Sequence, residues 1–113
     1  TPCYNEEVNV EICAQELKKV MSESLSNYEY EHIFADNAST DSTLMKLRQL
    51  AAEDKNIKVI SNSRNVGPFR NMWNAMKSAT GDAIVPLLPA DLQDPPTVIP
   101  ELVKNAVRRF IRM

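Results

Sequence analysis

The chain has 113 residues, with 13 Lys and Arg against 15 Asp and Glu, and its formal net charge is -2. This length and composition allow one modest globular domain, and the slightly acidic balance argues against a nucleic-acid partner. The apolar runs are far shorter than the roughly 20 residues of a membrane-spanning helix, so no membrane segment is expected in this chain. Cys3 and Cys13 do not have C-x-x-C spacing, and we expect two reduced thiols, as in a cytoplasmic protein.

Stretches with helical spacing alternate with short apolar runs along the chain. Helices are predicted over residues 6–24, 44–51, 69–76 and from 97 onwards. Strands are predicted at Tyr28–Phe34, Ile57–Ile60 and Ala83–Leu88, after a short leading strand at Thr1–Tyr4. This alternation is typical of a parallel α/β sheet. We therefore expect a single partial domain over residues 1–113, with a Rossmann-like three-layer α/β/α fold and a mainly parallel, truncated sheet.

The third predicted helix carries four large apolar side chains at helical spacing, namely Phe69, Met72, Trp73 and Met76. This spacing predicts that they form the core-facing side of the helix. His32 lies in a predicted strand and has no Cys or acidic residue at ligand spacing, so we expect it to be structural.

Polar residues follow each predicted strand. In an open parallel sheet, ligands bind outside the carboxyl ends of the strands. The four loops at these ends cover residues 1–7, 36–41, 61–67 and 89–94. Together they offer carboxylate and amide oxygens and one arginine to a single crevice, which favours a phosphate-bearing ligand and a divalent cation.

At these loops the chain resembles the family 2 glycosyltransferases, which have the GT-A fold. The motifs that carry the resemblance are Pro2-Cys3-Tyr4-Asn5-Glu6-Glu7, Asp36-Asn37-Ala38-Ser39-Thr40-Asp41, Ser63-Arg64-Asn65-Val66-Gly67, and Gly81-Asp82-Ala83 leading to Ala90-Asp91-Leu92-Gln93-Asp94-Pro95-Pro96. Their order and spacing cover nearly the whole chain. The last motif is similar to that of dolichyl-phosphate mannose synthases and bacterial polyprenyl-phosphate glycosyltransferases.

The resemblance implies the N-terminal, donor-binding part of an inverting transferase. Such an enzyme binds a UDP- or GDP-linked sugar and passes the sugar to a lipid-phosphate or saccharide acceptor. The residues implied in nucleotide-sugar binding are Pro2, Tyr4, Glu6, Asp36, Arg64 and Asp91. Asp36 corresponds to the carboxylate that accepts an N–H of the base, a contact that discriminates between bases.

Several of these residues also have local structural interpretations. Turn formation at the strand end is the alternative for Asp36 and Asn37, and helix capping is favoured for residues 39–41. Arg64 corresponds to an arginine that lies near the nucleotide and pairs with phosphate. A surface ion pair is an equally favoured role for this residue.

The implied metal ligands are Asp91 and Gln93, and the implied cofactor is Mg²⁺ or Mn²⁺. Mannose synthase-like proteins usually have Asp-Ala-Asp at this point, whereas this chain has Pro89-Ala90-Asp91. Because Mg²⁺ accepts one or two protein carboxylates together with substrate phosphates and water, this departure weakens the site without removing it.

The catalytic base on the acceptor side is expected beyond Met113, in a longer protein. One alternative is a non-catalytic nucleotide-binding module or an inactive transferase remnant, which Pro89 favours. A Rossmann-type dinucleotide enzyme is a weaker alternative, because the chain has no G-x-G-x-x-G pattern. We expect a cytoplasmic location, at the cytoplasmic face of a membrane for a full-length protein, and a homo-oligomer is compatible with the sequence.

Overall fold

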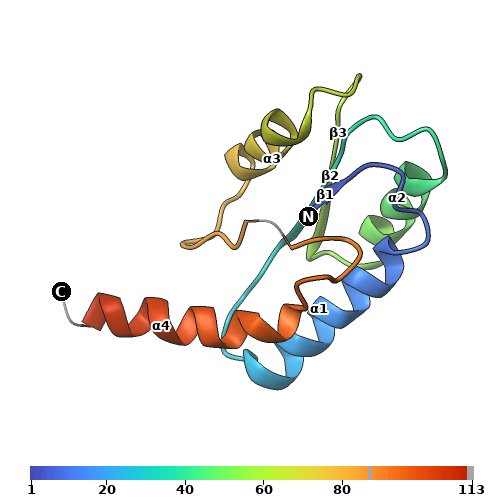
Figure 1. The fold of residues 1–113 in the computed structure, drawn as a ribbon. Helices are drawn as coiled ribbons and strands as arrows, with labels where there is room; N and C mark the ends of the chain where they lie inside the picture. Colours follow the sequence, from blue (N-terminus) through green and yellow to red (C-terminus); the bar gives the residue numbers. More distant parts are fainter. Residues whose placement is uncertain (87, 112–113) are drawn as a thin grey trace.

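The computed structural model of the protein describes residues 1–86 and 88–111, which form an α/β fold (Figure 1). The elements in chain order are β1 (Pro2–Cys3), α1 (Val10–Ser24), β2 (His32–Asp36), α2 (Thr43–Glu53), β3 (Ile57–Ser61), α3 (Pro68–Lys77), the 3₁₀ turn η1 (Pro96–Val98) and α4 (Ile99–Ile111). The helices α1 and α2 lie on one side of the sheet and α3 lies on the other (Figure 1). The predicted three-layer α/β/α arrangement is therefore confirmed.

The sheet is parallel, with the strand order β1-β2-β3. β2 pairs with β3 over five residues, from His32 opposite Ile57 to Asp36 opposite Ser61. β1 pairs with β2 over only two residues, and its last residue, Cys3, lies opposite Asp36. The three strands therefore end at the same level, and the loops that follow them leave from one edge of the sheet.

The core lies between the sheet and α1. The helix predicted over residues 6–24 is confirmed as α1, and Val10, Cys13 and Leu17, which recur in it at helical spacing, are all buried. Phe34 of β2 is fully buried in the same cluster. Cys3 and Cys13 are free, buried thiols, and burial raises the pKa of Cys3 to about 12. Both cysteines therefore act as small apolar core residues.

The strand predicted at Ala83–Leu88 is wrong. Its described residues, 83–86 and 88, form no strand, and residue 87 lies outside the described residues. Ile84 and Val85 are about half exposed. Pro86 has no N–H to donate to a neighbouring strand, and β1 offers an edge of only two residues, one of which is also a proline. Too few backbone hydrogen bonds are available there to hold a further strand.

The buried side of α3 also differs from the prediction. Phe69 is 81% exposed and Trp73 is 59% exposed, so their assignment to the core is wrong, whereas Asn71 is 2% exposed. The inner side of α3 faces polar groups at the strand ends, including the carbonyl oxygen of Ala35, which accepts a hydrogen bond from Asn71. An amide satisfies such groups and an aromatic ring does not.

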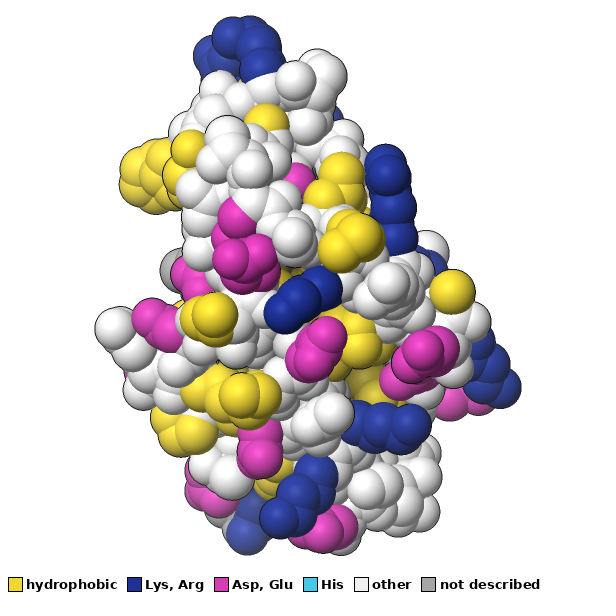
Figure 2. All heavy atoms as spheres, turned by 90° about the vertical axis from the view of Figure 1, so that its right-hand side faces the viewer, with side chains coloured by type: hydrophobic (Ala, Val, Ile, Leu, Met, Phe, Trp, Pro, Cys, Tyr) yellow, Lys and Arg dark blue, Asp and Glu magenta, His cyan; other side chains and the backbone are white. Residues whose placement is uncertain are grey.

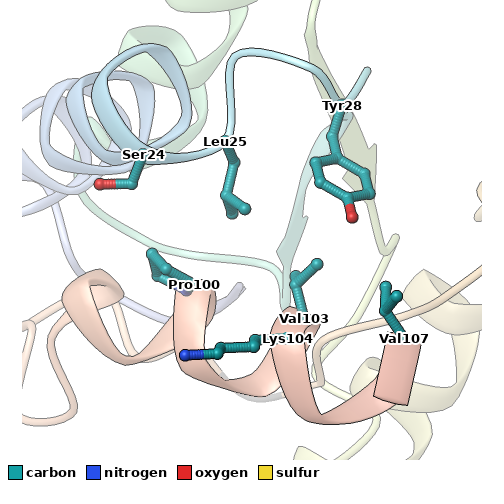
Figure 3. Close-up of a pocket in the computed structure, with 7 residues that line it drawn as sticks. All are labelled: Ser24, Leu25, Tyr28, Pro100, Val103, Lys104 and Val107. Atoms are coloured by element: carbon teal, nitrogen blue, oxygen red, sulfur yellow. The ribbon is translucent and has the colours of Figure 1, made fainter. Parts of the chain in front are cut away.

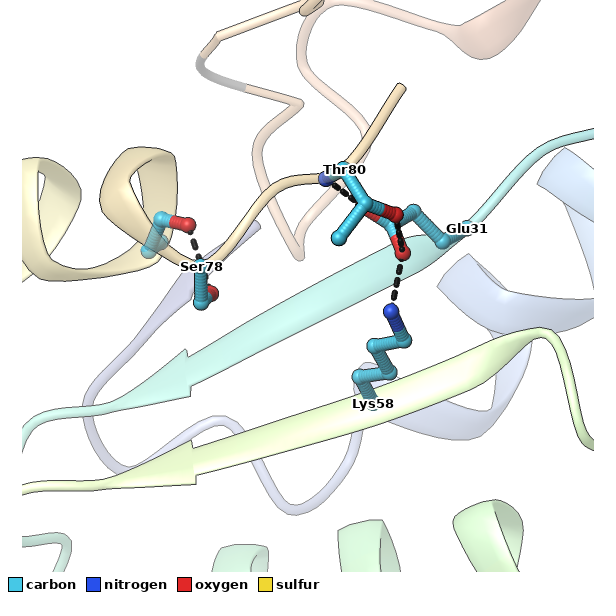
Figure 4. A network of polar contacts seen from close by, with 5 residues as sticks. Glu31, Lys58, Ser78 and Thr80 are labelled. Atoms are coloured by element: carbon cyan, nitrogen blue, oxygen red, sulfur yellow. Dashed lines mark hydrogen bonds and ion pairs between the residues drawn. The ribbon is translucent and has the colours of Figure 1, made fainter.

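A polar cluster at the opposite, amino edge of the sheet holds the segment that follows α3 (Figure 4). The carboxylate of Glu31 accepts hydrogen bonds from Thr80 N at 2.6 Å and Thr80 Oγ1 at 3.1 Å, and it pairs with Lys58 of β3. The hydrogen bond from Lys58 holds the pKa of Glu31 below its usual range. This cluster fastens residue 80 to the starts of β2 and β3.

The surface on the side of α1 and α2 carries acidic and basic side chains interspersed with small apolar patches (Figure 2). Within residues 1–86 and 88–111, no helix has the length and apolar character that crossing a bilayer requires.

Candidate functional site

The loop after β1 is hydrogen-bonded to the loop between β2 and α2. Asn5, at a positive φ of 52°, donates through its backbone N–H to Ser39 Oγ at 2.9 Å, and its Oδ1 accepts from Thr40 N at 2.8 Å. The backbone N–H of Glu6 donates to Thr43 Oγ1 at 2.9 Å. These contacts join two loops more than thirty residues apart in the sequence into one unit at the carboxyl edge of the sheet.

Asp36 lies at the end of β2, and its carboxylate is engaged by Ser39. Oδ1 accepts from Ser39 Oγ at 2.5 Å and Oδ2 accepts from Ser39 N at 3.2 Å, and the residue is 1% exposed. This is the strand-end turn that sequence analysis gave as the alternative role of Asp36. A carboxylate has about four acceptor positions, so the turn leaves some of them unused, but at 1% exposure they are covered by protein.

The other residues expected around the base lie in β1 and in the loop that follows it. Pro2 belongs to β1, and Tyr4 is 47% exposed in the loop that follows. Glu6 is half-buried, and its Oε2 accepts from Asn9 Nδ2 at 2.7 Å, at the start of α1. The structure therefore places Tyr4 at the open side of the edge and gives Glu6 a local bond at the helix entrance.

A network of asparagine side chains joins β2 to the loop after β3. Oδ1 of Asn37 accepts from Val66 N at 2.9 Å and from Asn62 Nδ2 at 3.1 Å. Nδ2 of Asn37 donates to Asn65 Oδ1 at 3.0 Å and to the Gly67 carbonyl at 3.4 Å. Gly67 has a φ of 86°, which glycine adopts without steric cost. The side chain of Asn37 thus fixes the path of the loop that carries Arg64.

Asn71 extends this network to α3. Its Oδ1 accepts from Asn62 Nδ2 at 2.8 Å, and its Nδ2 donates to the Ala35 carbonyl at 2.9 Å. Asn62 and Asn71 lie outside the four sequence motifs, and neither was predicted to have a role. The available signal was the density of asparagine, which occupies positions 62, 65, 71 and 74.

Arg64 lies in the loop fixed by Asn37, and its side chain is exposed. Within the part of the chain that the structure describes, Arg64 forms no ion pair. The surface ion pair considered as its alternative role is therefore not formed there, and the guanidinium faces solvent beside the carboxyl edge of the sheet.

The loop that contains Asp91 is anchored by its apolar neighbours. Leu88 and Ala90 are buried in the core cluster, whereas Asp91 and Gln93 are exposed. Oδ1 of Asp91 accepts from Gln93 N at 3.2 Å. Burial raises the pKa of the Cys13 thiol, and the carboxylates of Glu6 and Asp91 act in the same direction. The carbonyl oxygen of Pro89 lies 4.0 Å from the same thiol, so the start of the Asp91 loop packs against α1.

The few oxygen atoms that this loop offers suit a cation that is coordinated mainly by a bound substrate. Asp91 and Gln93 offer exposed oxygens, while Pro89 offers no side-chain ligand. Among residues 1–86 and 88–111 there is no group of three or more His, Cys, Asp or Glu side chains placed to hold a metal ion. Mg²⁺ bound through one carboxylate, substrate phosphates and water fits this arrangement, and a complete protein cage does not.

A groove of about 410 Å³ lies elsewhere, between the end of α1 and α4 (Figure 3). It is lined by Ser24, Leu25, Tyr28, Pro100, Val103, Lys104 and Val107. Leu25 and Tyr28 precede β2, so this groove lies toward the amino edge of the sheet. Its mainly apolar lining lacks the acidic and amide groups of the carboxyl edge.

Known proteins that are similar to this chain are named glycosyltransferases or glucosyl transferases. Over 104 residues, 92% of this chain, the chain is 39% identical to the "Uncharacterized glycosyltransferase YkcC" of Bacillus subtilis. Over the same share it is 36% identical to the "Prophage bactoprenol glucosyl transferase homolog" of Escherichia coli and 34% identical to the "Bactoprenol glucosyl transferase" of Shigella phage SfX. These matches cover 31%, 33% and 33% of the relatives, so the chain spans about a third of their length.

The family model described as "Glycosyl transferase family 2" matches residues 1–110. The Rossmann-like α/β/α arrangement agrees with the GT-A fold that the motifs imply. Because the family model covers nearly the whole chain, this protein belongs to glycosyl transferase family 2.

Proposed function

We propose that this chain is the donor-binding part of a glycosyltransferase that takes a sugar from a nucleoside diphosphate and transfers it to a polyprenyl phosphate. The observation that carries the proposal is the linked carboxyl edge, where the loops of Asp36 and Arg64 are fastened together by hydrogen bonds. A UDP- or GDP-linked sugar is the proposed donor. The acceptor class follows the relatives named bactoprenol glucosyl transferases.

The division of roles follows from the chemistry of each side chain. Asp36 accepts an N–H of the base, with Pro2, Tyr4 and Glu6 around it. Arg64 pairs with the diphosphate, since guanidinium matches phosphate oxygens in charge and geometry. Asp91, with Gln93, holds Mg²⁺ or Mn²⁺ against the diphosphate. A cation bound there stabilises the negative charge that develops on the leaving nucleoside diphosphate.

We expect Asp36→Ala to weaken binding of UDP or GDP by about 1–3 kcal/mol, because it removes a charged acceptor from the base. Isothermal titration calorimetry in the presence of Mg²⁺ measures the effect. The wild-type chain is expected to bind the nucleotide more tightly with Mg²⁺ than with a chelator.

Ser39→Ala is the matched control for Asp36→Ala. It removes the 2.5 Å hydrogen bond within the turn but retains the carboxylate. If Asp36 contacts the base, only Asp36→Ala weakens nucleotide binding. Equal losses in both variants would show that Asp36 acts only by holding the turn and would remove it from the nucleotide site.

Asp91→Asn is expected to abolish the cation dependence of nucleotide binding and to leave thermal stability nearly unchanged. An exposed amide retains the turn contact to Gln93 N, but it lacks the charge that a hard cation requires. Titrations with and without Mg²⁺, together with a melting curve, separate the two effects. A lower melting temperature with intact cation dependence would identify Asp91 as a loop anchor instead.

Pro89→Asp tests the same site from the opposite direction and addresses the alternative of a non-catalytic binding module. Restoring a carboxylate two residues before Asp91 is expected to strengthen Mg²⁺ or Mn²⁺ binding. Absence of any gain would argue that this loop does not hold the cation.

A further inference from the structure

The outward side of α3 presents two large aromatic side chains. Phe69 is 81% exposed and Trp73 is 59% exposed. They are four residues apart, so they are neighbours on one side of the helix. The opposite side holds the buried Asn71. α3 is the one helix on its side of the sheet within the described residues, and no other described element lies over its outer surface (Figure 1). Single exposed apolar residues are common, whereas an exposed aromatic pair on one helix indicates a binding surface.

The same side of α3 is cationic. Arg70 and Lys77 are exposed, and at about 100° per residue both project beside Trp73, away from Asn71. Residues 55–81 contain five Lys or Arg and no Asp or Glu, although the whole chain has a net charge of -2. The side of α1 and α2, in contrast, mixes charges of both signs (Figure 2). Two exposed basic side chains, Arg70 and Lys77, therefore flank the aromatic pair on α3.

We propose that the outward side of α3 binds the surface of a lipid bilayer with anionic headgroups. Phe69 and Trp73 enter the interface between headgroups and acyl chains, and Arg70 and Lys77 contact headgroup phosphates. Aromatic rings beside Lys and Arg on an amphipathic helix are the combination that lies in a membrane interface. The positive charge on this side of α3 is complementary to the negative charge of the headgroups.

The size of the surface favours a bilayer over an acidic protein. α3 has ten residues and is about 15 Å long and about 10 Å wide, so its outward side covers on the order of 150 Å², well below the roughly 800 Å² that each partner buries in a typical protein interface. A bilayer needs no shaped counterpart and accepts a single convex helix. Because α3 begins directly after the loop of Arg64, this contact brings the carboxyl edge of the sheet to the membrane.

Trp73 is the only tryptophan of the chain, so its fluorescence reports on this surface alone. The probe is vesicles of phosphatidylcholine mixed with phosphatidylglycerol, compared with vesicles of phosphatidylcholine alone. We expect the Trp73 emission to shift to the blue and the chain to sediment with the anionic vesicles. Added salt is expected to reverse both, since it screens charge attraction. Absence of binding to anionic vesicles, or equal binding to both kinds, would overturn the proposal.

The double variant Arg70→Gln/Lys77→Gln is expected to bind the anionic vesicles about 25-fold more weakly, at about fivefold for each basic residue. Lys18→Gln/Arg48→Gln is the matched control, because it removes two exposed basic residues of α1 and α2 and changes the net charge equally. Equal losses in the two double variants would show attraction by net charge alone and would contradict the proposal.

The aromatic contribution is tested in the same way. Phe69→Ser is expected to weaken vesicle binding and to reduce the blue shift of Trp73. Met45→Ser on α2, at a residue that is 56% exposed, is its control and is expected to change neither. Vesicle binding unchanged by Phe69→Ser would remove the aromatic side from the contact. The vesicles contain neither nucleotide nor polyprenyl phosphate, so the outcome is independent of the proposed sugar transfer.

Discussion

Replacing Asn71 with alanine is expected to lower the free energy of unfolding by about 2–4 kcal/mol, because it removes both hydrogen bonds of a buried amide and leaves a cavity in its place. The two bonds run from Asn62 Nδ2 to Asn71 Oδ1 at 2.8 Å and from Asn71 Nδ2 to the carbonyl oxygen of Ala35 at 2.9 Å. Asn71 itself is 2% exposed, so water does not readily replace the lost hydrogen bonds. Urea denaturation measures the loss.

Two further variants assign the loss to hydrogen bonding. Asn74→Ala removes one long contact of 3.5 Å from the same helix and is expected to cost well under about 1 kcal/mol. Asn71→Leu retains most of the side-chain volume but makes neither hydrogen bond, so its cost is expected to match that of alanine. If leucine restored stability, packing and not the amide network would hold α3 to the strand ends.

Acidification is expected to destabilise the chain through His32 by about 2.5 kcal/mol between pH 7 and pH 4.5. Burial lowers the pKa of His32 from 6.5 to about 3. Below pH 6.5 the unfolded chain therefore binds a proton that the folded chain does not, and stability falls by about 1.4 kcal/mol for each pH unit. The loss continues until the pH reaches the folded pKa, near 3. Denaturation curves across this range measure the slope.

The structural reason is that His32 is inside the fold. It is 4% exposed, its ring lies 4.0 Å from that of Phe34, and its Nδ1 has no hydrogen-bond partner among the described residues. It is the only histidine of the chain, so His32→Gln removes all histidine titration and serves as the control. The carboxylates titrate in both proteins, and the expected difference is a flatter profile for the variant. Parallel profiles would show that His32 binds its proton as readily in the folded state as in the unfolded state.

The elements that sequence analysis predicted well are those in which local pattern and tertiary contacts agree. The α1 stripe at Val10, Cys13 and Leu17 packs on the sheet as its spacing indicates, and the run from Ile57 pairs as β3. The arrangement of the three loops that follow β1, β2 and β3 at the carboxyl edge also follows from the parallel topology. The spacing of apolar residues is sufficient to predict the buried side of α1, because that side consists of apolar residues.

The wrong predictions for the strand at Ala83–Leu88 and for the buried side of α3 have a common cause. In both, the outcome depends on which groups of the fold lie beside the segment. The run Ile84-Val85 has strand character, but β1 offers too short an edge to pair with it. The apolar spacing of Phe69 and Trp73 predicts a helix but not which side is buried. The inner side of α3 is decided by the carbonyl of Ala35 and the amide of Asn62, neither of which has a periodic signal in the sequence.

The candidate site was predicted at the level of loops and less well at the level of contacts. The motifs place Asp36 and Arg64 at neighbouring strand ends, as the structure has them. They do not reveal that Ser39 donates a hydrogen bond to the carboxylate of Asp36 or that Asn37 accepts one from the Arg64 loop. Such contacts depend on side-chain directions in turns, which a motif does not encode.

The hydrogen bonds between the loop after β1 and the start of α2 have a consequence for ligand affinity. Asn5, Glu6 and Glu7 are all fixed by partners among residues 39–46, through bonds of 2.8–2.9 Å in each case. A loop that is mobile before binding loses conformational entropy when its ligand orders it, and this loss weakens the complex. Here that entropy is already lost when the chain folds. A ligand that enters the carboxyl edge therefore meets a preorganised wall, and the free energy of its contacts is retained as affinity.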